Sequence, residues 1–396
     1  MVDQLPWLSK CVRPMLRASA GHRYIGADLT NIEGRVNAWQ AGEQWKLTAF
    51  TMADYGLGPG IYETTAAGIV GIPIEQVSKA QRQAQGKIPE LACGYQGSVG
   101  AFVSMAANYN TKPEEVADVA AQTCPPELWA KTLAKFRPNM ASGLEPHIWT
   151  GIKVVVDGWR ARHPAIVQSW WDHQDAGVAA VSTPGMVVDC GKVRYLCTKG
   201  FLFCQVPNGE SMSYPTPRVI RQKRERLTPT DFHIADPTIT RWPRDDGSDY
   251  VRVGDRWYVE EEVWSNVVEV WGLIKGQWVP YTLYGGLQCE NVCQRIARDV
   301  HEAAMKRISY RVVTRDNRDI VPVELVKPYF VEDRPWPAPW VQVYPIVLHA
   351  HDEVLCESPI GFGTKEELAG LYAEHTSWTT GLPLAAKGWE DTRYVK

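Results

Sequence analysis

The sequence lacks any apolar run that approaches the roughly 20 residues of a membrane-spanning helix. It has no hydrophobic leader, and it lacks the paired CxxC motifs that zinc ribbons use. Its nine cysteines are an odd number, so a framework of paired disulfides is not expected. Together these absences predict a protein of a reducing cytoplasm with no membrane partner.

Excess charge is also missing, because the formal net charge is only −3 over 396 residues. A general attraction to nucleic acid is therefore excluded, and any such binding needs a local patch. One dense basic run exists, and it holds Arg218, Arg221, Lys223, Arg224 and Arg226. A run of this kind marks either a solvated face or a surface that grips a duplex, and both interpretations stay open.

What the chain does contain is apolar residues, at 45%, and 17 tryptophans. This composition predicts an ordered globular protein with a sizeable core in which most of the tryptophan rings pack. The alternative for some rings is stacking on bases. Apolar periodicity predicts strands at 23–29, 187–206, 341–348 and 353–357. It predicts helices at 31–41, 61–133, 159–180 and 290–308, with a long helix from Val77. Residues 229–256 are predicted to form a surface insertion.

Two short acidic motifs stand far apart in the chain. Asp28 ends the first predicted strand, and Asp352 lies between the last two strands in His349-Ala-His351-Asp352-Glu353. A carboxylate beside an apolar stretch is unfavourable unless something cationic meets it. Neighbouring strands lie about 4.8 Å apart and can bring distant aspartates together. The pair therefore predicts a two-metal site for phosphoryl transfer.

A second interpretation of the later motif is a zinc hydrolase. His349 and His351 are two positions apart and would share one face of a strand. This interpretation lacks a third ligand with supporting spacing.

The segment 82–97 carries a third motif. On a continuous helix, Lys87, Leu91 and Tyr95 fall at i, i+4 and i+8, so an ammonium and an aromatic ring would line one face. That face suits a nucleotide, with the cation at its phosphates and the ring beside its base. The alternative is an ordinary amphipathic helix with an extended lysine. The glycines here do not form a P-loop, because no Gly-Lys-Ser/Thr follows them.

Taken in order, the three motifs resemble those of family A DNA polymerases, the phage-type branch in particular. Asp28-Leu-Thr-Asn-Ile-Glu33-Gly-Arg35 resembles motif A, the segment from Lys87 to Gly97 resembles motif B, and His351-Asp352-Glu353 resembles motif C. The resemblance also includes residues 60–62, 290–299 and 381–389. It covers nearly the whole chain apart from the insertion at 229–256.

The resemblance implies an α+β fold, with a palm of antiparallel sheet and helices, a mainly helical fingers subdomain, and no thumb. The palm would comprise residues 1–60 and 159–396, and the fingers residues 61–158. Only 27 residues precede Asp28, so the thumb and exonuclease regions of relatives are missing. The expected location is the cytoplasm, that of the host if a phage encodes the chain.

The implied activity is that of a DNA-dependent DNA polymerase, which adds a deoxynucleoside monophosphate to a primer 3′ end. Its partners would be primer-template DNA and a dNTP. The alternative is the catalytic half of a split polymerase, inactive without a chain that carries the thumb or exonuclease. A single-subunit RNA polymerase shares the palm, but Glu33 and Glu353 argue against it.

Residue roles carry over motif by motif. Asp28 and Asp352 would bind two Mg²⁺ ions with the Leu29 carbonyl, and Glu353 would support that catalytic site from its edge. The residues that would meet the dNTP are Glu33, which excludes a 2′-hydroxyl, and Tyr62, Arg82, Lys87, Leu91 and Tyr95. The residues that would hold DNA are Arg35, Gln294 and His351.

Arg82 departs from the family pattern, because relatives place an arginine four residues before the motif B lysine and Gln83 holds that spacing here. On a regular helix, Arg82 would point about 140° away from Lys87. Pro89 cannot bond the Gln85 carbonyl and should distort this helix. We therefore expect a one-residue bulge that returns Arg82 to the face of Lys87.

Overall fold

The computed structural model describes residues 13–136, 143–236, 238–253, 256–314, 319–327 and 340–394. The chain divides into two compact units, residues 1–36 with 294–396 (unit 1) and residues 37–293 (unit 2). Both combine helices with antiparallel strands, which confirms the predicted α+β class. The palm and fingers boundaries stay a prediction. Within the described ranges, every helix is too short or too polar to cross a bilayer.

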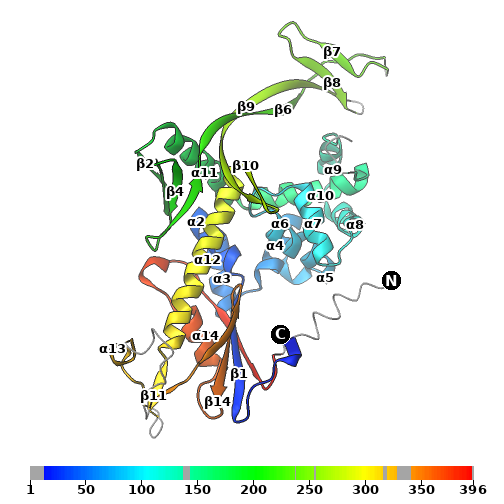
Figure 1. Ribbon diagram of the computed structural model, residues 1–396. Coiled ribbons are helices and arrows are strands. Elements are labelled where there is room, and N and C mark those ends of the chain that lie inside the picture. The colour runs from blue at the N-terminus through cyan, green and yellow to red at the C-terminus, as the bar shows by residue number, and fades with distance from the viewer. Residues whose placement is uncertain are drawn as a thin grey trace. The chain divides into compact units, whose positions relative to one another are not determined.

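Unit 1 is built on a four-stranded antiparallel sheet in the order β13-β14-β1-β15 (Figure 1). Its strands are β1 (His22–Leu29), β13 (Ile346–Ala350), β14 (Glu353–Pro359) and β15 (Ala386–Asp391). The strands predicted at 23–29 and 353–357 are confirmed. Helix α14 (Lys365–Ala373) packs against β1 and β15. Gly26 is needed in β1, because a Cβ there would lie 2.4 Å from the Trp389 ring.

The remaining elements of unit 1 are short or shared with unit 2. Those within unit 1 are β11 (Val312–Thr314), α13 (Val323–Val326), β12 (Trp340–Gln342) and the 3₁₀ helix η5 (Ser377–Thr379). The division between the units falls inside α2 (Ile32–Ala41) and inside α12 (Gly285–Ser309). Both of these helices were predicted from the sequence, α12 with a later start.

The first half of unit 2 is helical, as predicted. Its helices are α3 (Gln44–Asp54), α4 (Ile61–Val70), η1 (Ile74–Gln76), α5 (Lys79–Gln81), η2 (Arg82–Lys87), α6 (Ile88–Ala92), α7 (Val99–Asn108), α8 (Pro113–Thr123), α9 (Pro126–Leu133), α10 (Pro146–Arg162) and α11 (Pro164–Ser182). The single helix predicted over 159–180 is wrong. Pro164 lacks an N–H and starts a new helix, so the helical segment is interrupted at His163.

The core of this helical region contains large aromatic side chains. Trp159, Trp170 and Phe102 are each at most 2% exposed. The expectation that tryptophan packs the core is confirmed for these rings, whereas Trp242, Trp264 and Trp278 are exposed.

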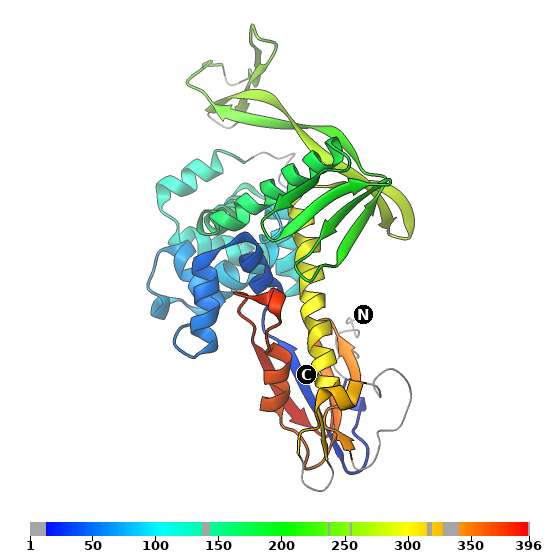
Figure 2. The ribbon, with the colours of Figure 1, turned by 90° about the vertical axis from the view of Figure 1, so that its left-hand side faces the viewer.

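A four-stranded antiparallel meander follows α11, which packs against it (Figure 2). Its strands are β2 (Val187–Cys190), β3 (Val193–Thr198), β4 (Phe201–Gln205) and β5 (Ser211–Pro215). The strands predicted at 187–206 are confirmed. Gly209 has a positive φ of 90° in the turn between β4 and β5, where glycine is favoured.

A second sheet of unit 2 forms a long ribbon, with β7 and β8 toward its far end (Figure 1). Its strands are β6 (Arg218–Pro229), β7 (Arg241–Pro243), β8 (Asp249–Val253), β9 (Arg256–Ile274) and β10 (Gln277–Leu283). The predicted insertion at 229–256 therefore contains strands, although residues 237, 254 and 255 lie outside the described residues.

The basic run falls on β6 and meets acids of β9. Arg218 pairs with Glu269 at 2.5 Å, and Lys223 pairs with Glu262. Arg221 instead lies over the Trp264 ring, with its guanidinium carbon 5.1 Å from the ring centre. The side chains of Arg224 and Arg226 lie outside the described residues. Two of the described cations are thus neutralised by neighbours on the adjacent strand.

Candidate active site

Motifs A and C meet through strand pairing. Asp28 of β1 lies opposite Glu353 of β14 in the antiparallel register, and the Leu29 N–H donates to the Asp352 carbonyl at 2.9 Å. His351, at the turn into β14, has a positive φ of 53°. The ladder thus holds the ends of two segments that are remote in the sequence side by side.

The three carboxylates of motifs A and C raise the pKa of one buried hydroxyl, that of Tyr372. Burial raises the pKa of Tyr372 far above its usual range, and Asp352, Asp28 and Glu353 raise it further in that order. Asp28 and Asp352 are half-buried, so both keep some contact with solvent. This is a concentration of negative charge at one end of the sheet.

Glu353 differs from the two aspartates. It is 6% exposed, and its carboxylate accepts hydrogen bonds from the Tyr394 hydroxyl at 2.7 Å and from Trp389 Nε1 at 3.4 Å. Burial, followed by this bond to Glu353, raises the pKa of Tyr394 to about 12. Glu353 is therefore anchored into the sheet beside Asp28.

The donor set at this place suits a hard cation. Within the described ranges no three His, Cys, Asp or Glu side chains converge as a complete protein-only metal site. Mg²⁺ does not need one, because it binds through one or two carboxylates together with substrate phosphates and water. Asp28 and Asp352, with the adjacent Leu29 carbonyl, fit that pattern.

The geometric premise of the zinc interpretation is wrong. Strand β13 ends at Ala350, and His351 lies beyond it in the left-handed turn. His349 and His351 therefore do not occupy alternate positions of one continuous strand.

A cavity of about 610 Å³ adjoins motif C within unit 1. Its lining includes Glu33, Gln294, His351 and Asp352, all of which the sequence singled out. Gln294 Nε2 donates to Glu33 Oε1 at 2.7 Å, which joins α12 to the start of α2. The structure thus gathers four predicted site residues around one hollow.

Arg35 is placed differently. It is 2% exposed, and it donates through Nε to the Thr30 carbonyl at 2.6 Å and through Nη1 to the Pro383 carbonyl at 3.4 Å. These contacts tie motif A to the segment before β15. Its expected contact with DNA stays a prediction.

The other predicted residues belong to unit 2. Residues Arg82–Lys87 form a π-helix, η2, between α5 and α6, which confirms the expected irregularity in motif B. Because a π-helix bonds i to i+5, it returns Arg82 to the side of Lys87. Gly86 permits this turn to lie close to α4, since a Cβ there would be 2.1 Å from the Tyr62 carbonyl.

Cations and aromatic rings gather around this π-helix. The Arg82 guanidinium lies 5.2 Å from the centre of the Tyr62 ring and pairs with Glu63, and Lys87 Nζ lies 4.0 Å from the centre of the Tyr109 ring. Burial raises the pKa of Tyr62 to about 12, Glu90 and Tyr109 raise it as well, and Arg82 opposes them. The structure therefore brings Tyr62, Arg82 and Lys87 into one cluster.

The expectation that Tyr95 shares a helix face with Lys87 and Leu91 is wrong. Helix α6 ends at Ala92, and the Gly94 carbonyl accepts bonds from Asn37 Nδ2 at 3.1 Å and Trp170 Nε1 at 3.0 Å. In a continuing α-helix, the Gly94 carbonyl would accept a hydrogen bond from the backbone N–H four residues later. Here the two side chains occupy that carbonyl instead. Tyr95 is half-buried against the helical core, and Leu91 is half-buried on α6.

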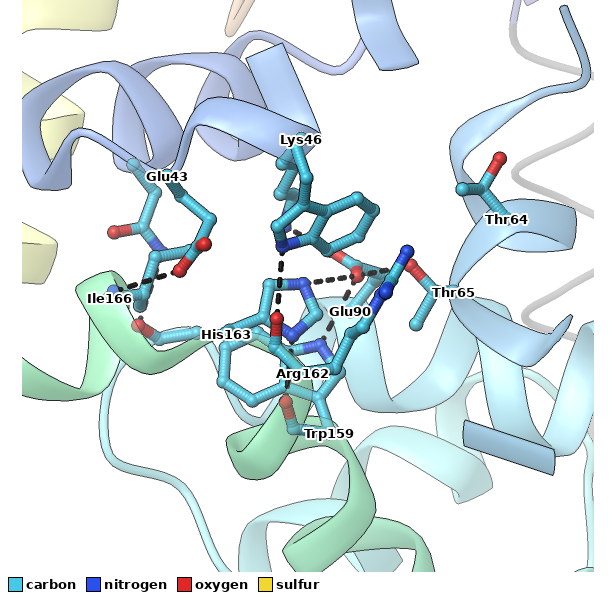
Figure 3. A network of polar contacts seen from close by, with 12 residues as sticks. Glu43, Lys46, Thr64, Thr65, Glu90, Trp159, Arg162, His163 and Ile166 are labelled. Carbon is cyan, nitrogen blue, oxygen red and sulfur yellow. Dashed lines mark hydrogen bonds and ion pairs between the residues drawn. The ribbon is translucent and has the colours of Figure 1, made fainter. Parts of the chain in front are cut away.

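Within the motif B segment, a buried carboxylate joins four helices (Figure 3). Glu90 of α6 is bound by Lys46 of α3, by Thr65 Oγ1 of α4 at 2.6 Å and by Trp159 Nε1 of α10 at 3.2 Å. His163 Nε2 lies 3.1 Å from the same carboxylate. Burial alone would raise the pKa of Glu90, but Lys46 and His163 outweigh burial and hold it well below its usual range.

Comparison with known proteins finds a curated relative. No family model matches the chain. The DNA polymerase of Bacillus phage SP02 is 26% identical over 398 aligned residues, which cover all of this chain and 45% of that protein. The chain is similar to a phage DNA polymerase along its whole length. This confirms the resemblance that the three motifs predicted.

This chain spans less than half the length of that relative. Among solved structures, the POL domain of Pol1 from M. smegmatis, in complex with DNA primer-template and dNTP, is 14% identical with a TM-score of 0.46. That match covers 98% of this chain and 42% of the other.

Sequence reasoning missed several residues around motif C and around motif B. Glu90 carries the same signal as Asp28, a carboxylate among apolar residues, and that signal correctly demands a cationic partner. Arg298 and His301 stand four and seven positions after Gln294, so helical spacing alone places them on its face. Tyr372 and Tyr109 carried no local signal.

Proposed function

We propose that this chain is the palm and fingers portion of a family A DNA polymerase, which adds deoxynucleoside monophosphates to a primer 3′ end. The observation that carries the proposal is the pairing of β1 with β14, which sets Asp28 beside Asp352 and Glu353. The similarity to the SP02 DNA polymerase supports the choice of reaction.

In the proposed reaction, the primer 3′ oxygen attacks the α-phosphorus of the dNTP. A new phosphorus–oxygen bond forms, the bond to the β-phosphate oxygen breaks, pyrophosphate leaves, and the hydroxyl proton passes to solvent. Two bound Mg²⁺ ions would supply charge neutralisation for this transfer. Asp28, Asp352 and the Leu29 carbonyl would hold them, and Glu353 would keep the end of β14 in place beside Asp28.

The remaining proposed roles concern the dNTP and the primer-template. Lys87 and Arg82 carry the positive charges that a triphosphate needs, and Tyr62 lies beside Arg82. Leu91 and Tyr95 stay proposed contacts of the sugar and the nascent base pair. Glu33, held by Gln294, would occupy the space of a 2′-hydroxyl, while Gln294, His351 and Arg35 would hold the primer-template.

The decisive experiment is primer extension by the purified 396-residue chain with magnesium. We expect extension by the wild type and none by Asp28→Ala or Asp352→Ala. A matched control is Glu366→Ala, which removes a carboxylate that is 74% exposed on α14 of the same unit and should leave extension intact. Activity that survives the loss of either aspartate would break the assignment.

The split-polymerase alternative makes a different prediction. There the chain would bind primer-template weakly and extend it only after a thumb-bearing or exonuclease-bearing chain is added, since much of the grip on phosphates would come from that partner. Steady extension by the chain alone would rule out this alternative. The cytoplasmic location stays a prediction.

A further inference from the structure

One wall of the cavity beside motif C carries basic groups to which the proposed reaction assigns no role. On α12, Gln294, Arg298 and His301 follow at i, i+4 and i+7, so they share one helix face. All three line the cavity, together with His349 of β13. The rings of His301 and His349 are 5.4 Å apart between centres.

Arg298 is available to a ligand. Its side chain is exposed, and it forms no hydrogen bond or ion pair with another residue that the structure describes. Glu302, one turn further along α12, pairs with Lys306 at 2.9 Å instead. An unpaired guanidinium on a cavity wall is a strong donor for phosphate oxygens.

His301 presents a second donor. It is 1% exposed, its Nδ1 is hydrogen-bonded to the Tyr372 hydroxyl, and its Nε2 has no hydrogen-bond partner among the described residues. Burial, with His349 and Arg298, lowers the pKa of His301 to about 4, so the ring is neutral at pH 7.

The position of the proton on His301 follows from counting partners. If Tyr372 donates to Nδ1, the ring proton is on Nε2 and one buried donor lacks a partner. If Nδ1 donates to Tyr372 instead, both the hydroxyl proton and a bare Nε2 lack partners. Because each unpaired buried polar group is unfavourable, the first arrangement is favoured. Nε2–H is then a neutral donor that awaits an acceptor.

We propose that Arg298 and His301, with His349 beside them, form a subsite for a phosphodiester of the primer-template backbone, next to the catalytic aspartates. The subsite rests on the proposed function, because it assigns the cavity to DNA. One cation together with the neutral N–H of His301 matches the single charge of a phosphodiester. A nucleotide triphosphate carries several charges and calls for more cations than this wall offers.

The test measures equilibrium binding of a fluorescent primer-template to the full chain at several salt concentrations, without dNTP. Arg298→Ala should weaken binding about tenfold and reduce the slope of log Kd against log salt by about one, because one phosphate contact is lost. His301→Phe should weaken binding about fivefold and leave the slope unchanged, because a neutral donor is lost. His301→Gln, which keeps an N–H, should recover part of the affinity.

The matched control is Lys306→Ala, which removes a cation of the same helix that is not part of the cavity wall. It should change neither affinity nor slope. Thermal unfolding of each variant shows whether the fold is kept, and Arg298, being exposed, should tolerate replacement.

Several results would overturn the proposal. Unchanged DNA affinity in both Arg298→Ala and His301→Phe would mean that water alone meets these donors, and a wild type that does not bind primer-template would exclude the subsite outright. A raised KM for dNTP with unchanged DNA affinity would assign the wall to the triphosphate. Binding is read without catalysis, so a failure of the Asp28 and Asp352 assignment would appear separately, in the extension assay.

Discussion

Two carboxylate sites of this protein differ in what surrounds the acid. Asp28 and Asp352 lie at strand ends, are half-buried, and share their neighbourhood with a third acid. Glu90 lies among four helices, its side chain is 5% exposed, and a lysine and three further polar groups surround it (Figure 3). The first arrangement sets three acids close together, whereas the second surrounds a single acid with a lysine and other polar groups.

An acidic residue in apolar surroundings therefore has two possible outcomes. Where a lysine reaches the carboxylate, as Lys46 reaches Glu90, the acid becomes part of the scaffold. Where acids are brought together, as at Asp28 and Glu353, the charge favours a cation from outside. Substitutions at the two kinds of acid should separate effects on activity from effects on stability.

The largest effect is expected at the strand ends. Asp352→Asn and Asp28→Asn should each lower the rate of primer extension by about 10³-fold or more, because in the proposed reaction these two acids would hold the metal ions that stabilise the charge of the transferred phosphate. The free energy of unfolding should change by less than about 1 kcal/mol. Single-turnover extension and urea unfolding measure the two quantities, and a large loss of stability would show that these acids are structural after all.

Next in size is the loss of the buried acid. Glu90→Ala should lower the free energy of unfolding by about 3–5 kcal/mol, because Lys46 is left buried without its partner. Replacing both partners, as in Lys46→Met with Glu90→Leu, should recover much of that loss, since no buried charge then remains unpaired. Chemical unfolding of the single and double variants gives the comparison. If the single and the double variant lost the same free energy of unfolding, the proposed role of the ion pair would be contradicted.

The buried acid should also show in the pH dependence of stability. Because the pKa of Glu90 is lowered in the fold, its contribution is complete above the pKa of an unfolded glutamate, about 4.3, and is lost as the pH falls toward the lowered value. The unfolding midpoint of the wild type should therefore fall more steeply between about pH 5 and pH 2 than that of Glu90→Gln. If the unfolding midpoints of the two proteins fell in parallel as the pH is lowered, the expected contribution of Glu90 would be contradicted.

The smallest effect is expected at Glu353, which combines both environments. Glu353→Gln keeps an acceptor for Tyr394 but loses the charge, so the free energy of unfolding should fall by only about 1 kcal/mol. Extension should slow by about tenfold, less than for either aspartate. A loss as large as that of Asp352→Asn would place Glu353 among the groups that bind the metal.

Much of the architecture could be predicted because it is local. Apolar periodicity and turn residues predicted the strand at β1, the meander from β2 to β4, and α12. Pro89 predicted the helix irregularity that the structure shows as a π-helix. Predictions failed where distant groups interrupted a local pattern. The helix expected to carry Tyr95 ends at Ala92, where Asn37 and Trp170 bind the Gly94 carbonyl.

The amino-acid pattern was enough to single out Asp28 and Asp352, because a carboxylate beside an apolar stretch is unfavourable without a cationic partner, but the same signal at Glu90 was missed. The different surroundings of these acids emerge only when the chain is folded. Strand pairing gathered Asp28, Asp352 and Glu353, while helix packing delivered Lys46 to Glu90. The physical reason is that the partner of a buried charge comes from elsewhere in the chain, at a distance that no local pattern encodes.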